Sequence, residues 1–228
     1  MKVSPSINKI LTKCPKCAMP GNITPMTLTL AQQPFNDKEW QFEIKWDGFR
    51  MLAYCSGDQV NLSSRRNNSF NKKFASIKNE LERMKLNAIL DGEVVMLNED
   101  GLPNFSNIIA PNQKGSVVFY VFDILWVNGR NVLDIPLYQR RKLLKATLAK
   151  SDIVRFSDHV DEKGIELFNL VEKHNVEGVV AKHRQGVYSP GHRSNQWLKI
   201  KTGKQVEAFV AGYLFDKDKY AVSSLIIR

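Results

Sequence analysis

The chain has 228 residues, 43% hydrophobic and 25% charged, which is enough for one large domain or a domain plus a fragment. No apolar run of about eighteen residues is present, so we expect no membrane span. Residues 1–8 lack an apolar core of signal-peptide length, and there are three cysteines. We therefore expect a cytosolic, reducing setting. The net charge of +10 suits a polyanion such as nucleic acid, although a merely soluble basic protein would carry the same charge.

Residues 1–18 show little pattern and are predicted to form a linker or a disordered lead. Cys14 and Cys17 form a CxxC pair, and Cys55 is the only other cysteine. A closed zinc site needs four ligands, and the histidines lie far along the chain without the spacing of a zinc finger. The pair is interpreted as incidental.

The pattern of apolar residues predicts short strands with interspersed helices. Ile44 and Trp46 alternate with Glu43, Lys45 and Asp47, so a strand would project the three charged side chains from one face. The predicted elements, in chain order, are the strand through residue 45, a hairpin of 49–54 and 60–63, a helix within 71–85, strands 88–97 and 117–125, helices 138–150 and 161–174, and strands 178–182, 197–201, 206–213 and 221–227. This order has no regular βαβ alternation and indicates an α+β fold.

Four charged clusters interrupt otherwise apolar strands, at residues 45–50, 91–93, 177–182 and 197–201. Burying such charges is costly unless they pair or bind a ligand. Together they supply a candidate nucleophilic lysine, two acids suited to a hard divalent metal, and further cations suited to phosphate. This inventory indicates phosphoryl or nucleotidyl transfer, in which catalysis is mostly positioning and charge neutralisation.

With these clusters in place, the sequence resembles the covalent nucleotidyltransferase superfamily of DNA ligases, RNA ligases and mRNA capping enzymes. Within it, the chain looks like an ATP-dependent DNA ligase, in particular the ligase module of bacterial end-joining ligases (the ligase D family). The likeness covers roughly residues 19–228. The motifs that carry it stand in the family's order at residues 43–50, 64–67, 91–93, 119–125, 177–182, 188–194 and 197–201.

The resemblance implies an ATP-grasp-like adenylation domain over residues 19–203, built of antiparallel sheets flanked by helices. Residues 204–228 would be the start of a truncated OB-fold domain. Because that domain would orient the leaving group, we expect a folded adenylation domain that is slow to adenylylate itself and poor at sealing alone.

The resemblance also implies the chemistry. Lys45 would attack the α-phosphate of ATP to form a lysyl-AMP. The AMP would pass to a DNA 5′-phosphate, and a 3′-hydroxyl would displace it. Asp47 would orient or deprotonate near the nucleophile, while Lys199 and Lys201 would neutralise the α-phosphate. Positive charge around Lys45 disfavours its protonation and so makes it a nucleophile near neutral pH.

The resemblance further implies that Glu43 contacts the adenine amino group, with Ile44 beside it, and that Phe122 stacks on the adenine. Arg50 would bind the ribose hydroxyls, and Glu93 and Glu177 would bind ribose or a Mg²⁺ or Mn²⁺ ion. Arg65 would contact the sugar and later the 5′-phosphate, and Arg65 and Arg66 would contact DNA.

Several alternatives stay open. Phe122 could be a core residue, and Arg65 could be a structural ion pair with Arg66 as the DNA contact. Asp91 could set a strand end, and Asp123 is expected to brace backbone or an arginine. Lys182 could contact the α-phosphate or be a solvated cation. The charge run at 138–142 is predicted to be a wet helix face.

The expected partner is nicked or broken double-stranded DNA, with end-joining repair proteins or upstream modules of a longer polypeptide as further partners. The expected location is the bacterial cytoplasm, at the nucleoid during repair. Two other functions remain open: an RNA ligase or capping-type nucleotidyltransferase, and a weakly active nucleic-acid-binding remnant.

Overall fold

The computed structural model describes residues 5–98, 101, 103, 115–203, 209–216 and 221–227. Its first sheet has the order β4-β3-β5-β6-β7 with β8 beside β6, and its second sheet has the order β1-β11-β10-β2-β9. The first sheet consists of β3 (Phe49–Ser56), β4 (Gln59–Ser64), β5 (Asn87–Leu97), β6 (Ser116–Val127), β7 (Arg130–Asn131) and β8 (Val154–Phe156). The second consists of β1 (Thr27–Leu30), β2 (Asp37–Ile44), β9 (Val160–Glu162), β10 (Gly178–His183) and β11 (Arg193–Lys201).

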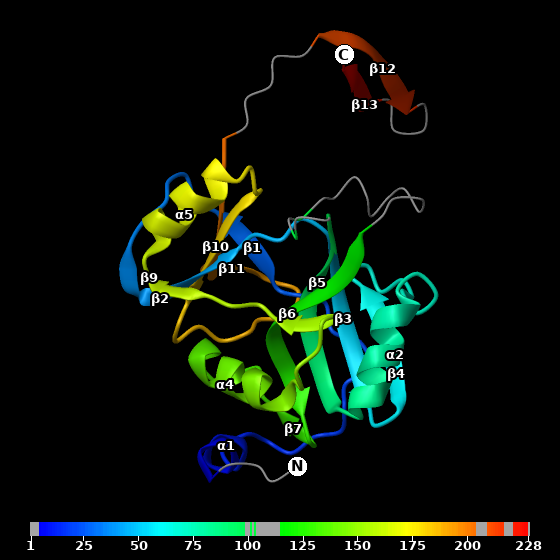
Figure 1. Ribbon diagram of the computed structural model, residues 1–228, viewed down its shortest axis with the longest axis vertical. Helices are drawn as coiled ribbons and strands as arrows, with labels where there is room; N and C mark the ends of the chain where they lie inside the picture. The colour runs from blue at the N-terminus through cyan, green and yellow to red at the C-terminus, as the bar shows by residue number, and fades with distance from the viewer. Residues whose placement is uncertain are drawn as a thin grey trace.

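Neighbouring strands run antiparallel, except for the parallel pairs β1–β11 and β6–β8. Four helices are described: α1 (Pro5–Leu11), α2 (Ala75–Met84), α4 (Leu137–Thr147) and α5 (Gly164–Lys173). Figure 1 shows α5 against the second sheet and α2 and α4 against the first. Sheets with short strands and segregated helices confirm the predicted α+β class.

Side-chain alternation along the strands explains the layers. In β3, Met51 and Ala53 pack in the core under α2 and α4, whereas Leu52 and Tyr54 point the other way. In the second sheet, Phe42, Val179 and Ala181 pack in the core under α5. The opposite faces of the two sheets meet in a third cluster, which contains Phe122, Tyr188 and Trp197. Side chains alternate between the two faces of a strand. The charged residues that alternate with the helix-facing core residues are therefore directed toward the junction of the two sheets.

Gly48 lies where the chain crosses from the second sheet to the first. A Cβ at this position would lie 2.0 Å from the Val94 carbonyl oxygen in β5. Only glycine permits this approach, so the glycine of the lysine motif serves the crossover. Consequently Lys45, which follows β2 directly, lies between two sheets and not within one hairpin.

The prediction that residues 138–142 form a solvent-exposed helix face is wrong for Arg140 and Arg141. Arg140 is 0% exposed and Arg141 is 3% exposed. Arg140 makes a bidentate contact with Asp123, at 2.8 and 2.9 Å, and Arg141 pairs with Glu43. Two buried carboxylates therefore draw the arginines inward. The expectation that Asp123 braces an arginine is confirmed.

The N-terminal segment is partly folded onto the domain. Helix α1 contacts α4, and Cys14 is buried in the core next to the first sheet. Arg130 donates to the Cys14 carbonyl at 2.7 Å, and Cys17 N donates to Gly129 O at 3.0 Å. These contacts differ from the linker expected over residues 1–18.

Two further strands, β12 (Val210–Asp216) and β13 (Ala221–Ile227), pair with each other and with no other described strand. Their apolar side chains are exposed, 64% for Ile227 for example. The hairpin agrees with the predicted strands, although residues 204–208 and 217–220 lie outside the described part. The OB-fold start stays a prediction. Among the described helices, none has the length and apolar character to cross a bilayer.

Candidate functional site

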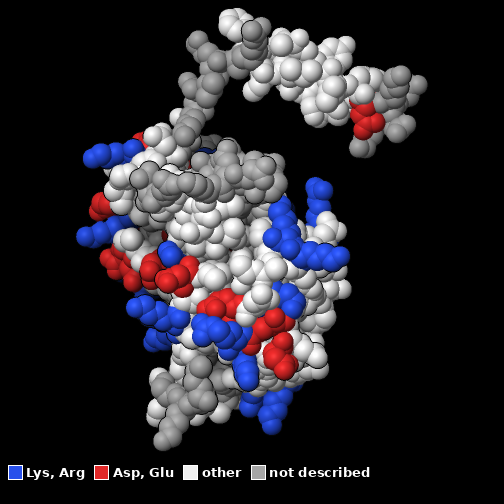
Figure 2. All heavy atoms as spheres, turned by 45° about the vertical axis from the view of Figure 1, so that its right-hand side comes forward, with Lys and Arg blue, Asp and Glu red and all other residues white. Residues whose placement is uncertain are grey.

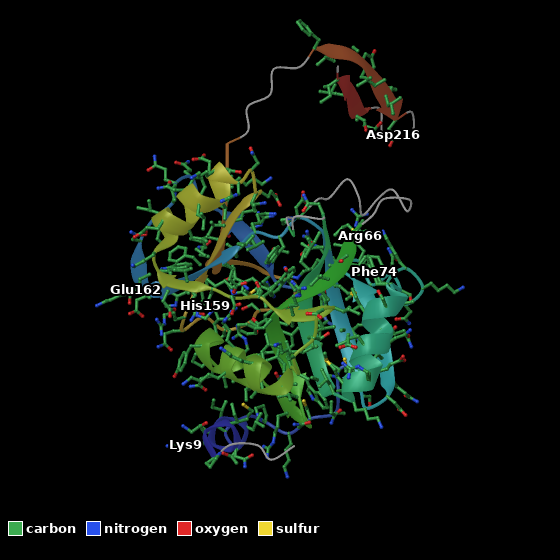
Figure 3. All side chains as sticks on the ribbon, in the orientation of Figure 1. Lys9, Arg66, Phe74, His159, Glu162 and Asp216 are labelled. Atoms are coloured by element: carbon green, nitrogen blue, oxygen red, sulfur yellow. The ribbon has the colours of Figure 1, made fainter. Side chains whose placement is uncertain are left out.

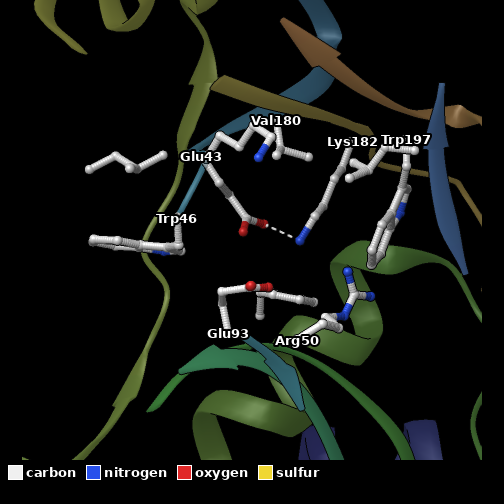
Figure 4. A pocket seen from close by; sticks show the side chains of 11 residues that line it. Glu43, Trp46, Arg50, Glu93, Val180, Lys182 and Trp197 are labelled. Atoms are coloured by element: carbon white, nitrogen blue, oxygen red, sulfur yellow. Dashed lines mark ion pairs between the residues drawn. The ribbon is translucent and has the colours of Figure 1, made fainter. Parts of the chain in front are cut away.

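The site is a pocket at the junction of the two sheets, and it collects side chains from β2, β3, β5, β6, β10 and β11 (Figure 4). Five predicted nucleotide-binding residues line it together with Lys45: Glu43, Ile44, Arg50, Glu93 and Phe122. Trp46, Lys182 and Trp197 complete the polar and aromatic walls. The structure thus brings together residues that lie more than a hundred positions apart in the chain.

Glu43 forms the buried end of the pocket. Its side chain is 2% exposed and its Oε1 lies 2.5 Å from Arg141 Nη1 and 2.9 Å from Lys182 Nζ. Ser157 Oγ donates to the other oxygen, Oε2, at 3.3 Å. A buried carboxylate requires such partners because desolvation is costly.

Lys182 is buried, which excludes the alternative of a solvated cation. Its Nζ lies 4.2 Å from the Phe122 ring centroid and 4.3 Å from that of Trp197. Apart from the ion pair with Glu43, no described acceptor is aligned with Nζ for a hydrogen bond. Desolvation lowers the pKa of Lys182 to about 8, although the Glu43 charge raises it. The ammonium group is therefore aimed into the pocket beside two aromatic rings.

Arg50 forms the opposite wall. Its guanidinium makes a bidentate contact with Asp91, at 2.6 and 2.7 Å, and lies 4.5 Å from the Phe122 centroid. Burial lowers the pKa of Arg50, but the Asp91 charge outweighs it and raises the pKa overall. Tyr188 donates to Asp91 Oδ2 at 2.7 Å. Asp91 therefore holds Arg50 from the middle of β5, and the alternative that it only sets a strand end is wrong.

Phe122 is a core residue that also lines the pocket, and its stacking on adenine stays a prediction. The ring belongs to the core cluster between the sheets, and it also lines the pocket. Glu93 faces the same space, and desolvation raises its pKa to about 8, against the lowering effect of Arg50 and Lys45. The burial of Glu93 therefore favours the neutral form of its carboxyl group.

The mouth of the pocket carries the charged groups that are more accessible to water. Lys45 forms an ion pair with Glu177, whose Oε1 lies 3.7 Å from Lys201 Nζ. Burial raises the pKa of Asp47, and the Glu177 charge adds to this effect. Desolvation lowers the pKa of Lys199, and the nearby cations Lys201 and Lys45 lower it further. The five predicted residues therefore share one electrostatic environment.

Arg65 and Arg66 occupy different positions. Arg65 lines an adjoining hollow together with Arg50, Glu93 and Lys199. Arg66 is exposed and lies toward α2, whereas His159 lies toward the second sheet (Figure 3). Among the described residues, neither arginine has an ion-pair partner, so the alternative of a structural ion pair for Arg65 finds no support in this part of the chain.

Sequence reasoning missed the residues that support the pocket from behind, chiefly Arg141 and Ser157. The signal for Arg141 was its spacing: Leu137, Arg141 and Leu144 recur at the interval of one helix face, and the structure buries all three. It also missed the wall formed by Trp46, which stacks on Tyr120 with ring centroids 3.8 Å apart.

The described residues contain no group of three or more His, Cys, Asp or Glu side chains placed to hold a metal ion. Of the predicted metal ligands, Glu93 lies in β5 of the first sheet, whereas Glu177 directly precedes β10 of the second sheet. Two carboxylates are hard oxygen donors, a set that suits Mg²⁺, which keeps several waters and binds through one or two carboxylates and substrate phosphates.

A lysine next to a pocket between two sheets is the arrangement of a nucleotidyltransferase domain, and solved DNA ligases share this fold. The structure described as mycobacterial DNA ligase D complexed with ATP and MES matches with a TM-score of 0.75 and 31% identity, over 90% of this chain and 67% of that chain. The ligase domain of LigD from M. tuberculosis matches with a TM-score of 0.71 and 32% identity, over 78% of this chain and 60% of that one.

The model of the ATP dependent DNA ligase domain matches residues 2–201, and the chain belongs to that family. The multifunctional non-homologous end joining protein LigD of Mycolicibacterium smegmatis is 34% identical over 87% of this chain and 26% of its own length. The SPbeta prophage-derived DNA ligase-like protein LigB of Bacillus subtilis is 29% identical over 88% of this chain and 75% of its own. The chain therefore spans about a quarter of the LigD relative, and the resemblance to the ligase D group is confirmed.

Proposed function

We propose that this chain is the adenylation domain of an ATP-dependent DNA ligase, in which Lys45 takes AMP from ATP and passes it to a DNA 5′-phosphate. The observation that carries the proposal is the position of Lys45 at the mouth of a pocket whose buried end offers a carboxylate and an ammonium group between aromatic rings. A purine base suits these walls, since its faces stack on aromatic rings and its edge carries hydrogen-bond donors and acceptors.

In the proposed first step the Lys45 Nζ–phosphorus bond forms and the bond from phosphorus to the pyrophosphate oxygen breaks. Lys45 must lose a proton to attack, and the Glu177 carboxylate paired with it is the nearest acceptor. Asp47, whose pKa is raised, is the second carboxyl group at this position. Lys199 and Lys201 stabilise the negative charge that develops on the phosphate. Arg50 would hold the ribose, and Glu43 with Ile44 would contact the adenine.

Glu93 and Glu177 would hold a Mg²⁺ or Mn²⁺ ion. The ion would supply positive charge at the phosphates. The raised pKa of Glu93 fits a site that takes a cation, because a bound cation would favour the ionised carboxylate over the protonated one.

Nicked or broken double-stranded DNA is the proposed substrate. The net charge of +10 favours a polyanion, and Figure 2 shows several groups of Lys and Arg side chains on one face, with Asp and Glu between them. Arg65 adjoins the pocket and would meet the 5′-phosphate, with Arg66 beside it on DNA. The multifunctional, end-joining character of the LigD relatives supports further modules and end-joining partners, and a DNA substrate in a bacterium supports a place in the cytoplasm at the nucleoid.

The experiment is a labelling panel with α-labelled ATP and GTP and with NAD labelled in its adenylate. Label should appear on the parent chain from ATP and be absent from the Lys45→Ala variant. The conservative Lys45→Arg variant keeps the positive charge and should also fail, since a guanidinium is not a nucleophile. Label from GTP alone, or equal label on Lys45→Ala, would overturn the proposal.

A further inference from the structure

Arg141 holds the buried carboxylate from outside the pocket. Its Nη1 lies 2.5 Å from Glu43 Oε1, and its Nη2 donates to the Ser157 carbonyl at 2.6 Å. Nη2 also lies 2.9 Å from His159 Nδ1. Arg141 itself does not line the pocket. The guanidinium is thus fixed at both terminal nitrogens, and it meets the carboxylate through Nη1, while no described group accepts from Nε.

Ser157 completes the arrangement on the other carboxylate oxygen. Its hydroxyl donates to Glu43 Oε2 at 3.3 Å and accepts from Trp46 Nε1 at 3.0 Å. Trp46 lines the pocket and is the neighbour of Lys45 in the chain. Both oxygens of Glu43 therefore have a partner, and the plane of the carboxylate is tied to the pocket wall.

The charges around Glu43 indicate what Arg141 contributes to the pocket. Two cations, Arg141 and Lys182, surround the single carboxylate of Glu43. With Lys182 alone, the carboxylate would be drawn to the ammonium group that faces the pocket. Arg141 supplies a second counter-charge to the same oxygen, Oε1, from behind the pocket, while Oε2 accepts only the Ser157 hydroxyl among the described hydrogen bonds and has capacity for a further donor.

We propose that Arg141, assisted by Ser157, is a positioning residue that orients the Glu43 carboxylate and thereby sets the selectivity for a base with a 6-amino group. The inference rests on the proposed function, since it takes the nucleotide to be ATP. A fixed carboxylate accepts from an amino donor and gains nothing from a base that lacks one. A site built around a hydrogen bond discriminates more strongly than an apolar pocket does.

The test compares equilibrium binding of ATP with that of purine riboside triphosphate, which lacks the 6-amino group. Binding needs no chemical step, so the result does not depend on the rate of adenylylation. The parent should prefer ATP by at least about tenfold, the value expected for one hydrogen bond to a charged group. Arg141→Met should bring the ratio close to one, and Ser157→Ala should lower it severalfold.

Lys142→Met is the matched control, because it removes a positive charge from an exposed neighbour on the same helix and should leave the ratio unchanged. Thermal unfolding identifies variants that fail to fold, and in that case Arg141→Lys and Ser157→Ala carry the test. A parallel loss of affinity for both nucleotides, with the ratio intact, would overturn the positioning role. A parent that binds ATP without preference would overturn it too, while leaving the proposed function standing. A parent that binds neither nucleotide would overturn both.

Discussion

The two ends of the pocket use the same kinds of side chain in different surroundings. At the buried end, the side chains of Glu43, Arg141 and Lys182 are 2–4% exposed. At the mouth, those of Lys45, Glu177 and Lys201 are 17–54% exposed. Charges in the interior are held in one arrangement because separating them is costly, whereas charges near water can exchange partners. The buried end is thus suited to recognition, and the mouth to a reaction in which a proton and an adenylyl group move.

The largest expected effect belongs to the nucleophile at the mouth. Lys45→Ala should lower adenylylation by at least about a thousandfold, since it removes the proposed nucleophile and the other pocket lysine, Lys182, is held by the buried carboxylate of Glu43. The free energy of unfolding should change little, because an ion pair near the surface contributes about 0–1 kcal/mol. Single-turnover label transfer and chemical denaturation measure the two quantities. Full activity in Lys45→Ala would contradict the assignment.

A carboxylate-to-amide substitution should reduce the free energy of unfolding more at the buried end of the pocket than at its mouth. Glu43→Gln leaves Arg141 and Lys182 without their buried counter-charge, so the free energy of unfolding should fall by about 3–5 kcal/mol. Urea unfolding of this variant beside Glu166→Gln, an exposed control on α5, measures the difference. An unchanged midpoint would show that the buried network is not needed for folding.

The raised pKa of Glu93 predicts a dependence of stability on pH. The folded pKa of about 8 exceeds the unfolded value, which is about 4.3, so the folded state binds more protons between these two values. The contribution of the Glu93 carboxyl group to the free energy of unfolding is therefore fully present below about pH 4.3 and is lost as pH rises toward about 8.

Glu93→Gln should remove that loss. The stability of the variant relative to the parent should rise between pH 5 and pH 9, by on the order of 1–3 kcal/mol. Thermal unfolding at several pH values, without divalent cations, follows the change. A constant difference across this range would mean that Glu93 ionises at its ordinary pKa.

The smallest effect on stability is expected for Glu177→Gln at the mouth. Its partners are partly exposed, so the free energy of unfolding should change by less than about 1 kcal/mol. Adenylylation should nevertheless fall by about ten- to a hundredfold, because the variant removes the nearest proton acceptor for Lys45. Equal losses in stability at Glu43 and Glu177 would remove the distinction between the two ends.

The sequence was sufficient for the longer strands and for most of the pocket, but not for the short strands β1, β7, β8 and β9. Period-two alternation placed Glu43 and Lys45 on one strand face, and the structure directs both into the junction between the sheets. It could not supply the sheet order, in which β2 pairs with β10 and β9 while β3 lies in the other sheet. Long-range pairing depends on contacts that no local pattern encodes.

The supporting residues were missed for a related reason. Arg140 and Arg141 read as a solvated run because charged residues are seldom buried. Their burial depends on Asp123 and Glu43, which lie 17 and 98 positions away in the chain. A buried ion pair becomes visible only when both partners have been placed. Ser157 carried no signal of its own, since it follows Phe156 and precedes Asp158 in a stretch without a recognisable motif.

The most direct test of the central claim is to locate the adenylate. The purified chain, incubated with ATP and Mg²⁺, is measured by intact mass spectrometry and then by peptide mapping. A gain of one adenylate, confined to the peptide that contains Lys45 and abolished in Lys45→Ala, is the result that the two-ended pocket predicts. An adenylate on another lysine, or none after long incubation with a chain that binds ATP, would contradict it.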